Sequence, residues 1–245
     1  MGGRARVDLF NTIKQNPDYW LIDQVKKERV TDLDYAGAFA HLLEEWHQER
    51  ISYLSLLMDE IHEDWLLEQG FRKISAIVEY TRLLDETFAP EWAVTIETLA
   101  ESQMNDTSFA SFYDSCRSGS ANKNNLFTIE QVLESFENEL GPEWRTHCYI
   151  FKEDGDPIGL SIPHIEQGTL DQGRLFYFGV VPEQRGQGYG AVLHRLSLGL
   201  LRSLGATTYV GSTDENNRHM IHIFERNGCY LRDKKGIYRI DREGK

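Results

Sequence analysis

The chain has 245 residues, more than the ~100–150 of a typical domain, so it is long enough for one large domain or two smaller ones. Its composition, 40% hydrophobic and 27% charged, is that of an ordinary globular protein and excludes disordered, collagen-like and coiled-coil classes. The 39 acidic and 26 basic residues give a formal net charge of −13, which disfavours nucleic acid and anionic lipid as partners because both are polyanions.

The sequence shows no sign of export or of membrane insertion. Cys116, Cys148 and Cys229 are an odd set without a C-x-x-C pair, so we expect them to be reduced packing residues. The N-terminus has no apolar signal core, and the apolar run 175–181 is too short to span a bilayer. We therefore expect a cytoplasmic protein that does not bind membranes.

The first predicted elements lie within residues 35–84. A helix is expected after Asp32 or Asp34 as N-cap, and a strand over 51–56, a short helix ending at Gly70 and an extended stretch over 71–84 follow it. The apolar residues that define the first helix recur at helical spacing: Tyr35, Phe39, Leu42, Leu43 and Trp46.

A second series of elements begins after Pro90, which disfavours helix at the preceding residue. We expect a strand over 92–98, a helix over 108–117, a polar loop over 118–125 and a helix over 128–140 capped by Thr128. Strands over 146–151, 158–165 and 174–181 complete this part. The first part has no predicted counterpart of these elements.

The last elements repeat the first ones. A helix from Tyr189 to Leu204, a strand over 208–213, a short helix ending at Gly228 and an extended stretch over 229–240 follow in the same order. The pairs Gly70 and Gly228, Ile51 and Tyr209, and Tyr35 and Leu193 are each 158 positions apart. This spacing predicts an internal repeat, with residues 1–89 as a partial unit and 90–245 as a complete domain. Two unrelated α/β segments are the alternative.

The sequence between the 174–181 strand and the following helix has the pattern of an anion-binding loop. Gly186, Gly188 and Gly190 stand at alternate positions beside Arg185, directly before the helix. Such a loop turns several N–H groups toward one point, and the helix N-terminus adds about half a positive charge. A glycine-rich turn without a ligand is the alternative. A dinucleotide-binding loop is disfavoured because Thr208 lies where that fold has an acid, about 20 residues on.

The same loop, after Val-x-Pro-Glu at 180–183, resembles the acyl-CoA loop of the GCN5-related N-acetyltransferase (GNAT) superfamily. The similarity continues downstream at Asn217 and Gly228 and covers about residues 92–240. It implies an α/β fold whose mixed central sheet is splayed open at the cofactor site, with acetyl-CoA as acyl donor. Asn217 would contact the cofactor arm or simply cap its helix. The resemblance implies that pantetheine would bind the main chain of Gly179, Val180 and Val181, and pyrophosphate would bind Arg185, Gly186, Gln187, Gly188, Tyr189 and Gly190.

The catalytic groups depart from the family pattern. Many members carry a tyrosine that protonates the leaving thiolate where this chain has Phe224, and Cys229 replaces the phenylalanine of a Gly-Phe pair. Asp214 is the best candidate base, followed by Glu215, although an acid at a strand end also serves as a helix cap. The histidines show no metal-ligand spacing, so no metal is expected.

The N-terminal part resembles a degenerate half of the same fold. At the repeat spacing, residues 26–32 fall where the cofactor loop stands, but they contain no glycine and end in Asp32, so they should not hold a pyrophosphate. Such a half-unit exposes a sheet edge, which favours packing on the second unit or formation of a homodimer.

The resemblance implies an acetyl-CoA-dependent N-acetyltransferase that transfers acetyl directly to a primary amine of a small molecule or peptide. A main-chain N–H between Gly179 and Val181 would stabilise the oxyanion. A non-catalytic acyl-CoA-binding or interaction protein is the main alternative, and an NAD-dependent enzyme is the second.

Overall fold

The computed structural model describes residues 9–88, 93–119 and 128–242. The chain forms two compact units: unit 1 is Met1–Val78 with Asp233–Lys245, and unit 2 is Glu79–Arg232. This differs from the expected division after residue 89, because two long strands each pass from one unit into the other. The expected junction at Pro90 and most of the polar loop after Ser118 lie outside the described residues.

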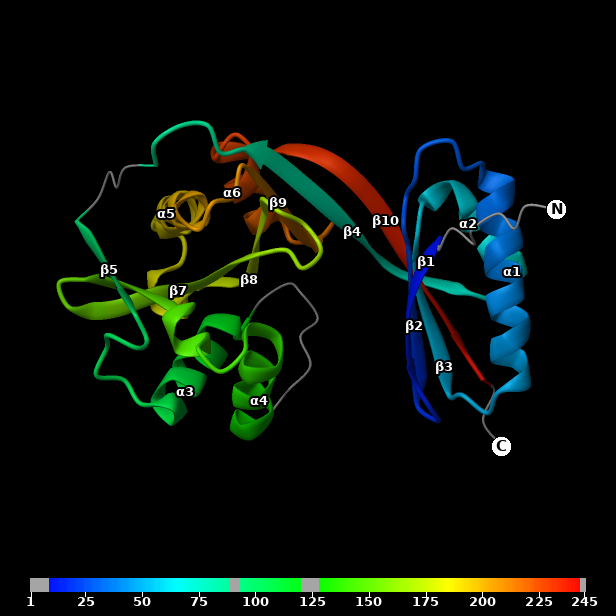
Figure 1. The fold of residues 1–245 in the computed structure, drawn as a ribbon, viewed down its shortest axis with the longest axis horizontal. Coiled ribbons are helices and arrows are strands. Elements are labelled where there is room, and N and C mark those ends of the chain that lie inside the picture. Colours follow the sequence, from blue (N-terminus) through cyan, green and yellow to red (C-terminus); the bar gives the residue numbers. More distant parts are fainter. Residues whose placement is uncertain (1–8, 89–92, 120–127, 243–245) are drawn as a thin grey trace. The chain divides into compact units, whose positions relative to one another are not determined.

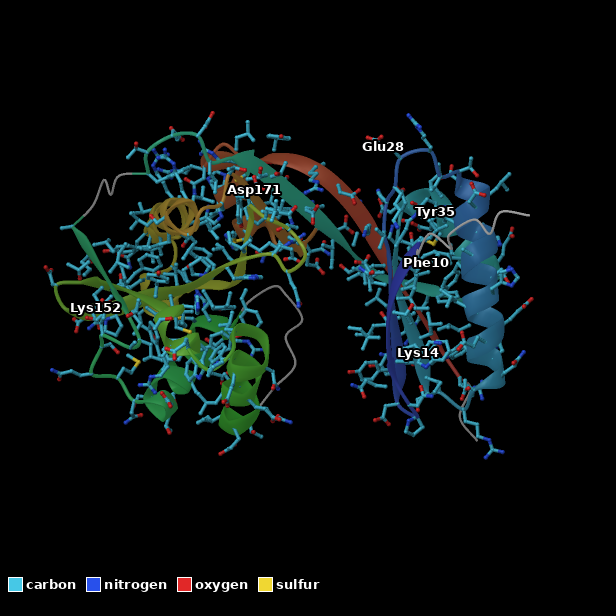
Figure 2. All side chains as sticks on the ribbon, viewed as in Figure 1. Phe10, Lys14, Glu28, Tyr35, Lys152 and Asp171 are labelled. Atoms are coloured by element: carbon cyan, nitrogen blue, oxygen red, sulfur yellow. The ribbon has the colours of Figure 1, made fainter. Side chains whose placement is uncertain are left out.

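Unit 1 is a small sheet with two helices on one face (Figure 1). Its strand order is β1-β2-β3-β10-β4, with β2 and β3 parallel and both β1–β2 and β3–β10 antiparallel. Phe39 and Leu54 are fully buried between helix and sheet, and Phe10 packs edge to face on Tyr35 (Figure 2). The elements are β1 (Phe10–Gln15), β2 (Tyr19–Gln24), α1 (Asp32–Gln48), β3 (Tyr53–Met58), α2 (Glu63–Glu68), the first part of β4 (Arg72–Leu83) and the second part of β10 (Tyr230–Asp241).

Strands β1 and β2 were not expected, so the prediction that the first part of the chain has no counterpart of the early elements was wrong for the last two of them, the strands expected over 158–165 and 174–181. Strands β1 and β2 precede β3 as the antiparallel pair β7 (Asp156–Ile165) and β8 (Gln172–Val180) precedes β9 (Thr208–Asp214) in unit 2. Their sequence gives little signal because each has six residues and most of β1 is exposed. The helix that follows is capped by Thr31, whose capping box with Asp34 replaces the acidic cap expected from the sequence.

Unit 2 is a sheet between two pairs of helices (Figure 1). Its strand order is β4-β9-β8-β7-β6-β5, in which β5 to β8 are antiparallel neighbours and β8 and β9 are parallel. Helices α3 and α4 bury Phe109 and Phe136 on one face, and α5 buries Leu193 on the other. The elements are β5 (Val94–Thr98), α3 (Asp106–Arg117), α4 (Ile129–Leu140), β6 (Tyr149–Glu153), β7 (Asp156–Ile165), β8 (Gln172–Val180), α5 (Tyr189–Ser203), β9 (Thr208–Asp214) and α6 (Arg218–Arg226).

The sheet of unit 2 splays open between β8 and β9. These strands pair only where Gln172 lies opposite Thr208 and Gly173 lies opposite Tyr209, although both continue beyond that point. The remaining residues of β8 therefore expose main-chain groups along one edge. This opening confirms the mixed, splayed sheet expected from the resemblance.

The repeat spacing also holds in the structure. Strands β4 and β10 each have twelve residues, and both follow a glycine with a positive φ, Gly70 at 87° and Gly228 at 70°. This left-handed conformation is open to glycine without strain, which explains why glycine ends both short helices. No helix in the described part of the chain is long and apolar enough to cross a membrane.

Candidate functional site

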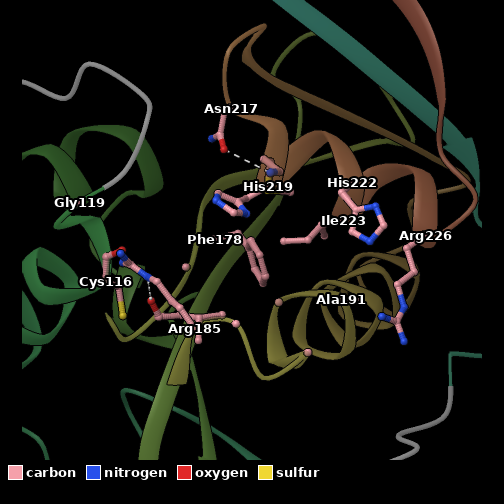
Figure 3. A pocket seen from close by; sticks show the side chains of 16 residues that line it. Cys116, Gly119, Phe178, Arg185, Ala191, Asn217, His219, His222, Ile223 and Arg226 are labelled. Carbon is pink, nitrogen blue, oxygen red and sulfur yellow. Dashed lines mark hydrogen bonds between the residues drawn. The ribbon is translucent and has the colours of Figure 1, made fainter. Parts of the chain in front are cut away.

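A cavity of about 580 Å³ lies in unit 2 where β8 leaves β9 (Figure 3). The end of β8, the loop after it, the start of α5 and one side of α6 surround it. Seven of the ten predicted cofactor residues line it: Gly179, Val180, Arg185, Gly186, Gly188, Gly190 and Asn217. The other nine lining residues were not predicted: Cys116, Gly119, Phe178, Ala191, His219, Met220, His222, Ile223 and Arg226.

The loop glycines have two different roles. Gly186 and Gly188 have φ angles of 76° and 95°, so they turn the main chain through the left-handed region. Gly190 instead lies against α6, where an added Cβ would approach Ile223 Cδ1 to 2.7 Å. The sequence pattern therefore combines two conformational requirements with one packing requirement.

The turns leave a row of unpaired donors at the start of α5. Within the described residues, no acceptor bonds the main-chain N–H of Gly186, Gln187, Gly188 or Gly190. Gly188 is the N-cap of α5 and has no side chain to cap the helix, which leaves the positive end of the helix dipole open to the cavity. These donors form a cradle for an anion such as a phosphate.

Arg185 holds the loop in place through its side chain. Its guanidinium donates to the main-chain oxygens of Val180, Ser118 and Cys116 at 3.0, 2.7 and 2.9 Å. The last two oxygens lie at the C-terminal end of α3, where a positive charge is favourable. The expected contact of Arg185 with pyrophosphate remains a prediction, but the structure gives this side chain a supporting role first.

The open edge of β8 offers different donors from those predicted. Val181 N–H donates to Ile158 at 3.0 Å, so by the alternation of an antiparallel pair Gly179 N–H also faces β7. The N–H groups of Phe178 and Val180 then face the side that β9 has left. Val180 N–H is thus the predicted donor that lies on the open edge, and Phe178 is a second donor that the sequence did not reveal.

A comparison with protein families identifies this segment. The model of the acetyltransferase (GNAT) family matches residues 111–229, which include the loop, α5 and α6. Residues 111–229 are therefore similar to the GNAT family. No curated protein matches it in sequence.

Solved structures extend the GNAT fold over nearly the whole chain. A GCN5-related N-acetyltransferase from Sphaerobacter thermophilus has a TM-score of 0.71 at 16% identity, covering 95% of this chain and 76% of that one. A tandem GNAT protein from the clavulanic acid biosynthesis pathway has a TM-score of 0.61 at 14% identity, covering 95% and 78%. A functionally unknown conserved protein of Staphylococcus epidermidis has a TM-score of 0.59 at 14% identity, covering 95% and 94%. At these identities the similarity shows the fold alone.

The remaining residues predicted for the GNAT site lie away from the cavity wall. The Tyr189 side chain is buried and its hydroxyl bonds Glu153, while the Gln187 amide donates to Glu183 and Gln184. Both can still contribute to the site through the main chain of the loop, because their side chains support its shape.

Asp214, the last residue of β9, and Asn217, the N-cap of α6, both make local hydrogen bonds. Asn217 caps α6 by accepting from Met220 N–H at 3.2 Å and also lines the cavity, so its two expected roles are compatible. Asp214 accepts from the main-chain N–H of Asn216 at 2.8 Å and is not part of the cavity wall. Its role as general base stays a prediction, and the geometry gives it a turn-forming role.

Phe224, at the position of the family tyrosine, points away from the cavity. It is 1% exposed and stacks on Tyr80 with ring centroids 5.2 Å apart. Behind it, His194 bonds Tyr209 and Asn227, and burial lowers the pKa of His194 to about 3. This imidazole is therefore neutral at physiological pH and serves the core of unit 2.

The cavity wall provides no ready nucleophile for covalent catalysis. Cys116 is its one thiol, and burial raises the pKa of that thiol to about 12, which keeps it protonated. Within the described residues, no three His, Cys, Asp or Glu side chains are grouped to hold a metal ion. The free N–H groups and the cationic side chains of the wall suit the binding of an anionic ligand.

In unit 1, the position that corresponds to the cavity of unit 2 is closed. Strands β2 and β3 pair over five residues, from Tyr19 opposite Tyr53 to Asp23 opposite Leu57, so the sheet does not splay there. The start of α1 is also occupied, because Thr31 accepts from Asp34 N–H and the Asp34 carboxylate accepts in return. A negative side chain thus stands where an anion would bind, as expected from the glycine-free sequence.

Proposed function

We propose that this chain transfers acetyl from acetyl-CoA to a primary amine of a small molecule or peptide. The observation that carries the proposal is the row of free N–H groups at the start of α5, beside an open edge of β8. The sixteen lining residues include no carboxylate, so the wall fits a ligand with several phosphates. Acetyl-CoA supplies an activated thioester when bound.

The residues of the wall support direct transfer. The acceptor nitrogen forms a bond to the thioester carbonyl carbon, the carbon–sulfur bond breaks, and the ammonium proton passes to water or to a carboxylate. The Val180 or Phe178 N–H on the open edge is placed to stabilise the oxyanion. The thiolate leaves without help from Phe224, which has no proton to give.

A non-catalytic acyl-CoA-binding protein is the second candidate, because Phe224 is buried in a core contact. Two measurements separate the candidates. Calorimetry with CoA and with NAD tests the ligand, and thiol release from acetyl-CoA with a panel of amines tests the reaction. We expect CoA binding and amine-dependent release; CoA binding without release from any amine would support the second candidate, and binding of NAD alone would exclude both.

A further inference from the structure

The ionisable groups of the cavity wall have one sign. Apart from the Cys116 thiol, they are Arg185, His219, His222 and Arg226. In a chain with 39 acidic and 26 basic residues, a wall without a carboxylate runs against the composition. The wall therefore concentrates positive charge in a protein that is negative as a whole.

Three of these groups project from one side of α6. His219, His222 and Arg226 follow helical spacing, and Figure 3 shows them beside Ile223 on the cavity side. All three are exposed rather than packed into the core. The opposite side of α6 carries Phe224 against β4, so the helix cannot rotate to turn these groups away.

The neighbouring elements bring no described carboxylate into the wall. From α5, His194 is buried and uncharged, and Arg195 pairs with Glu86. On α6, the Glu225 carboxylate accepts from the Tyr80 hydroxyl of β4. At the end of β9, Asp214 accepts from the main-chain N–H of Asn216. Protonation of the two wall histidines would therefore add charge to a site that is already cationic.

We propose that His219 and His222 are phosphate ligands that make the affinity for acyl-CoA rise as the pH falls, with Arg226 as a permanent charge beside them. This inference rests on the proposed function, because it concerns the same cavity. Histidine is the side chain whose charge ordinarily changes between pH 5 and 8. Each imidazolium that bonds a phosphate oxygen should tighten binding by about 3- to 10-fold.

Calorimetry of CoA on the full chain at pH 6, 7 and 8, at constant ionic strength, tests the proposal. The terminal phosphomonoester of CoA loses its second proton in the same range, with a pKa of about 6, and this works in the opposite direction. The reference is therefore the His219→Gln/His222→Gln variant. We expect the affinity of the wild type to fall from pH 6 to pH 8 by a factor at least about fivefold larger than that of the double variant.

Three controls test the result further. His41→Gln removes an exposed histidine of α1 and should keep the wild-type pH dependence. Arg226→Ala should weaken binding at every pH without flattening the slope. Pantetheine, which has no phosphate, should bind weakly and without pH dependence.

Parallel slopes for the wild type and the double variant would overturn the inference but leave the proposed function standing. Absence of CoA binding at every pH would overturn both. If the double variant does not fold, histidine NMR of the wild type replaces it: CoA should raise the titration midpoints of two histidines by at least about 0.5 unit. Unchanged midpoints would overturn the proposal.

Discussion

Arg185 Nη2 donates a hydrogen bond to the main-chain oxygen of Cys116 at 2.9 Å, which ties the loop before α5 to the end of α3. The same guanidinium also donates to the main-chain oxygens of Ser118 and Val180, so it binds three main-chain oxygens around the loop. A planar group with donors in fixed directions suits this role better than a point charge. Arg185 then shapes the loop, and the contacts with phosphate are left to the main chain of the loop and to the proposed ligands on α6.

The first prediction follows from this geometry. Arg185→Lys keeps the charge but cannot reach three oxygens, so we expect a loss of about 1–3 kcal/mol in the free energy of unfolding and a loss of CoA affinity close to that of Arg185→Ala. Urea unfolding and calorimetry measure both effects, with the exposed Arg50→Lys as the control. Retention of wild-type CoA affinity by the lysine variant would show that charge alone matters.

The second prediction concerns the packing of the loop helix on α6. In Gly190→Ala the new Cβ would approach Ile223 Cδ1 to 2.7 Å, so we expect CoA affinity to fall and stability to drop by about 1 kcal/mol. Ile223→Val removes that atom, so the Gly190→Ala/Ile223→Val double variant should regain CoA affinity and stability.

Gly37→Ala is the matched control for this change. Gly37 lies within α1 and has no atom within 4 Å of an added Cβ, so alanine there should stabilise the protein by about 0.5–1 kcal/mol. Thermal melting and CoA calorimetry report the two effects. A Gly190→Ala variant that binds CoA like the wild type would refute the packing role.

The parts of the site that local sequence determines were predictable. The glycines of the loop and the apolar spacing of α5 depend on neighbours in the chain, and both lie as expected. In the sequence, His219 and His222 are only two histidines three positions apart, because their role depends on which side of α6 faces the cavity. Together with Ile223 and Arg226, they follow helical spacing after the N-cap Asn217, and this spacing could have indicated a helix that lines a cavity.

Contacts between distant segments were not predictable. Two of the three carbonyl oxygens bound by Arg185, those of Cys116 and Ser118, lie more than sixty positions away. The pairing of β8 with β7 decides which N–H groups of β8 face the open edge. Strand β1 was not predicted because most of its residues are exposed and its apolar and polar side chains do not alternate.

The third prediction tests whether the family tyrosine can be restored. Phe224→Tyr places a hydroxyl in a core contact beside Tyr80 and His194 rather than in the cavity wall. We expect amine-dependent thiol release to stay within about twofold of the wild type and stability to fall by about 1–2 kcal/mol. Steady-state kinetics and urea unfolding check this, and a tenfold higher kcat would contradict the placement of Phe224.

The fourth prediction is a pH dependence of stability caused by His194. Burial lowers its pKa to about 3 from an ordinary 6.5, so between these values the unfolded state binds a proton that the folded state does not. Its contribution is complete above pH 6.5 and is lost as the pH falls, by about 1.4 kcal/mol per unit. The free energy of unfolding of the wild type should therefore fall more steeply from pH 7 to 5 than that of His194→Gln. Equal slopes would contradict it.

The last prediction concerns the passage of β10 from unit 2 into unit 1. In unit 1 this strand lies between β3 and β4, where Ile237 is opposite Leu57 and the buried Tyr238 packs into the core with Trp20. A chain ending at Arg232 loses the pairing partner of β3, so residues 9–78 should lose their slow-exchanging amides in hydrogen exchange. Tyr238→Ala keeps the strand but leaves a void. It should lower the free energy of unfolding by about 3–5 kcal/mol and leave the slow-exchanging amides of residues 9–78 in place. Protection of β3 in the shortened chain equal to that in the full chain would show that unit 1 does not depend on β10.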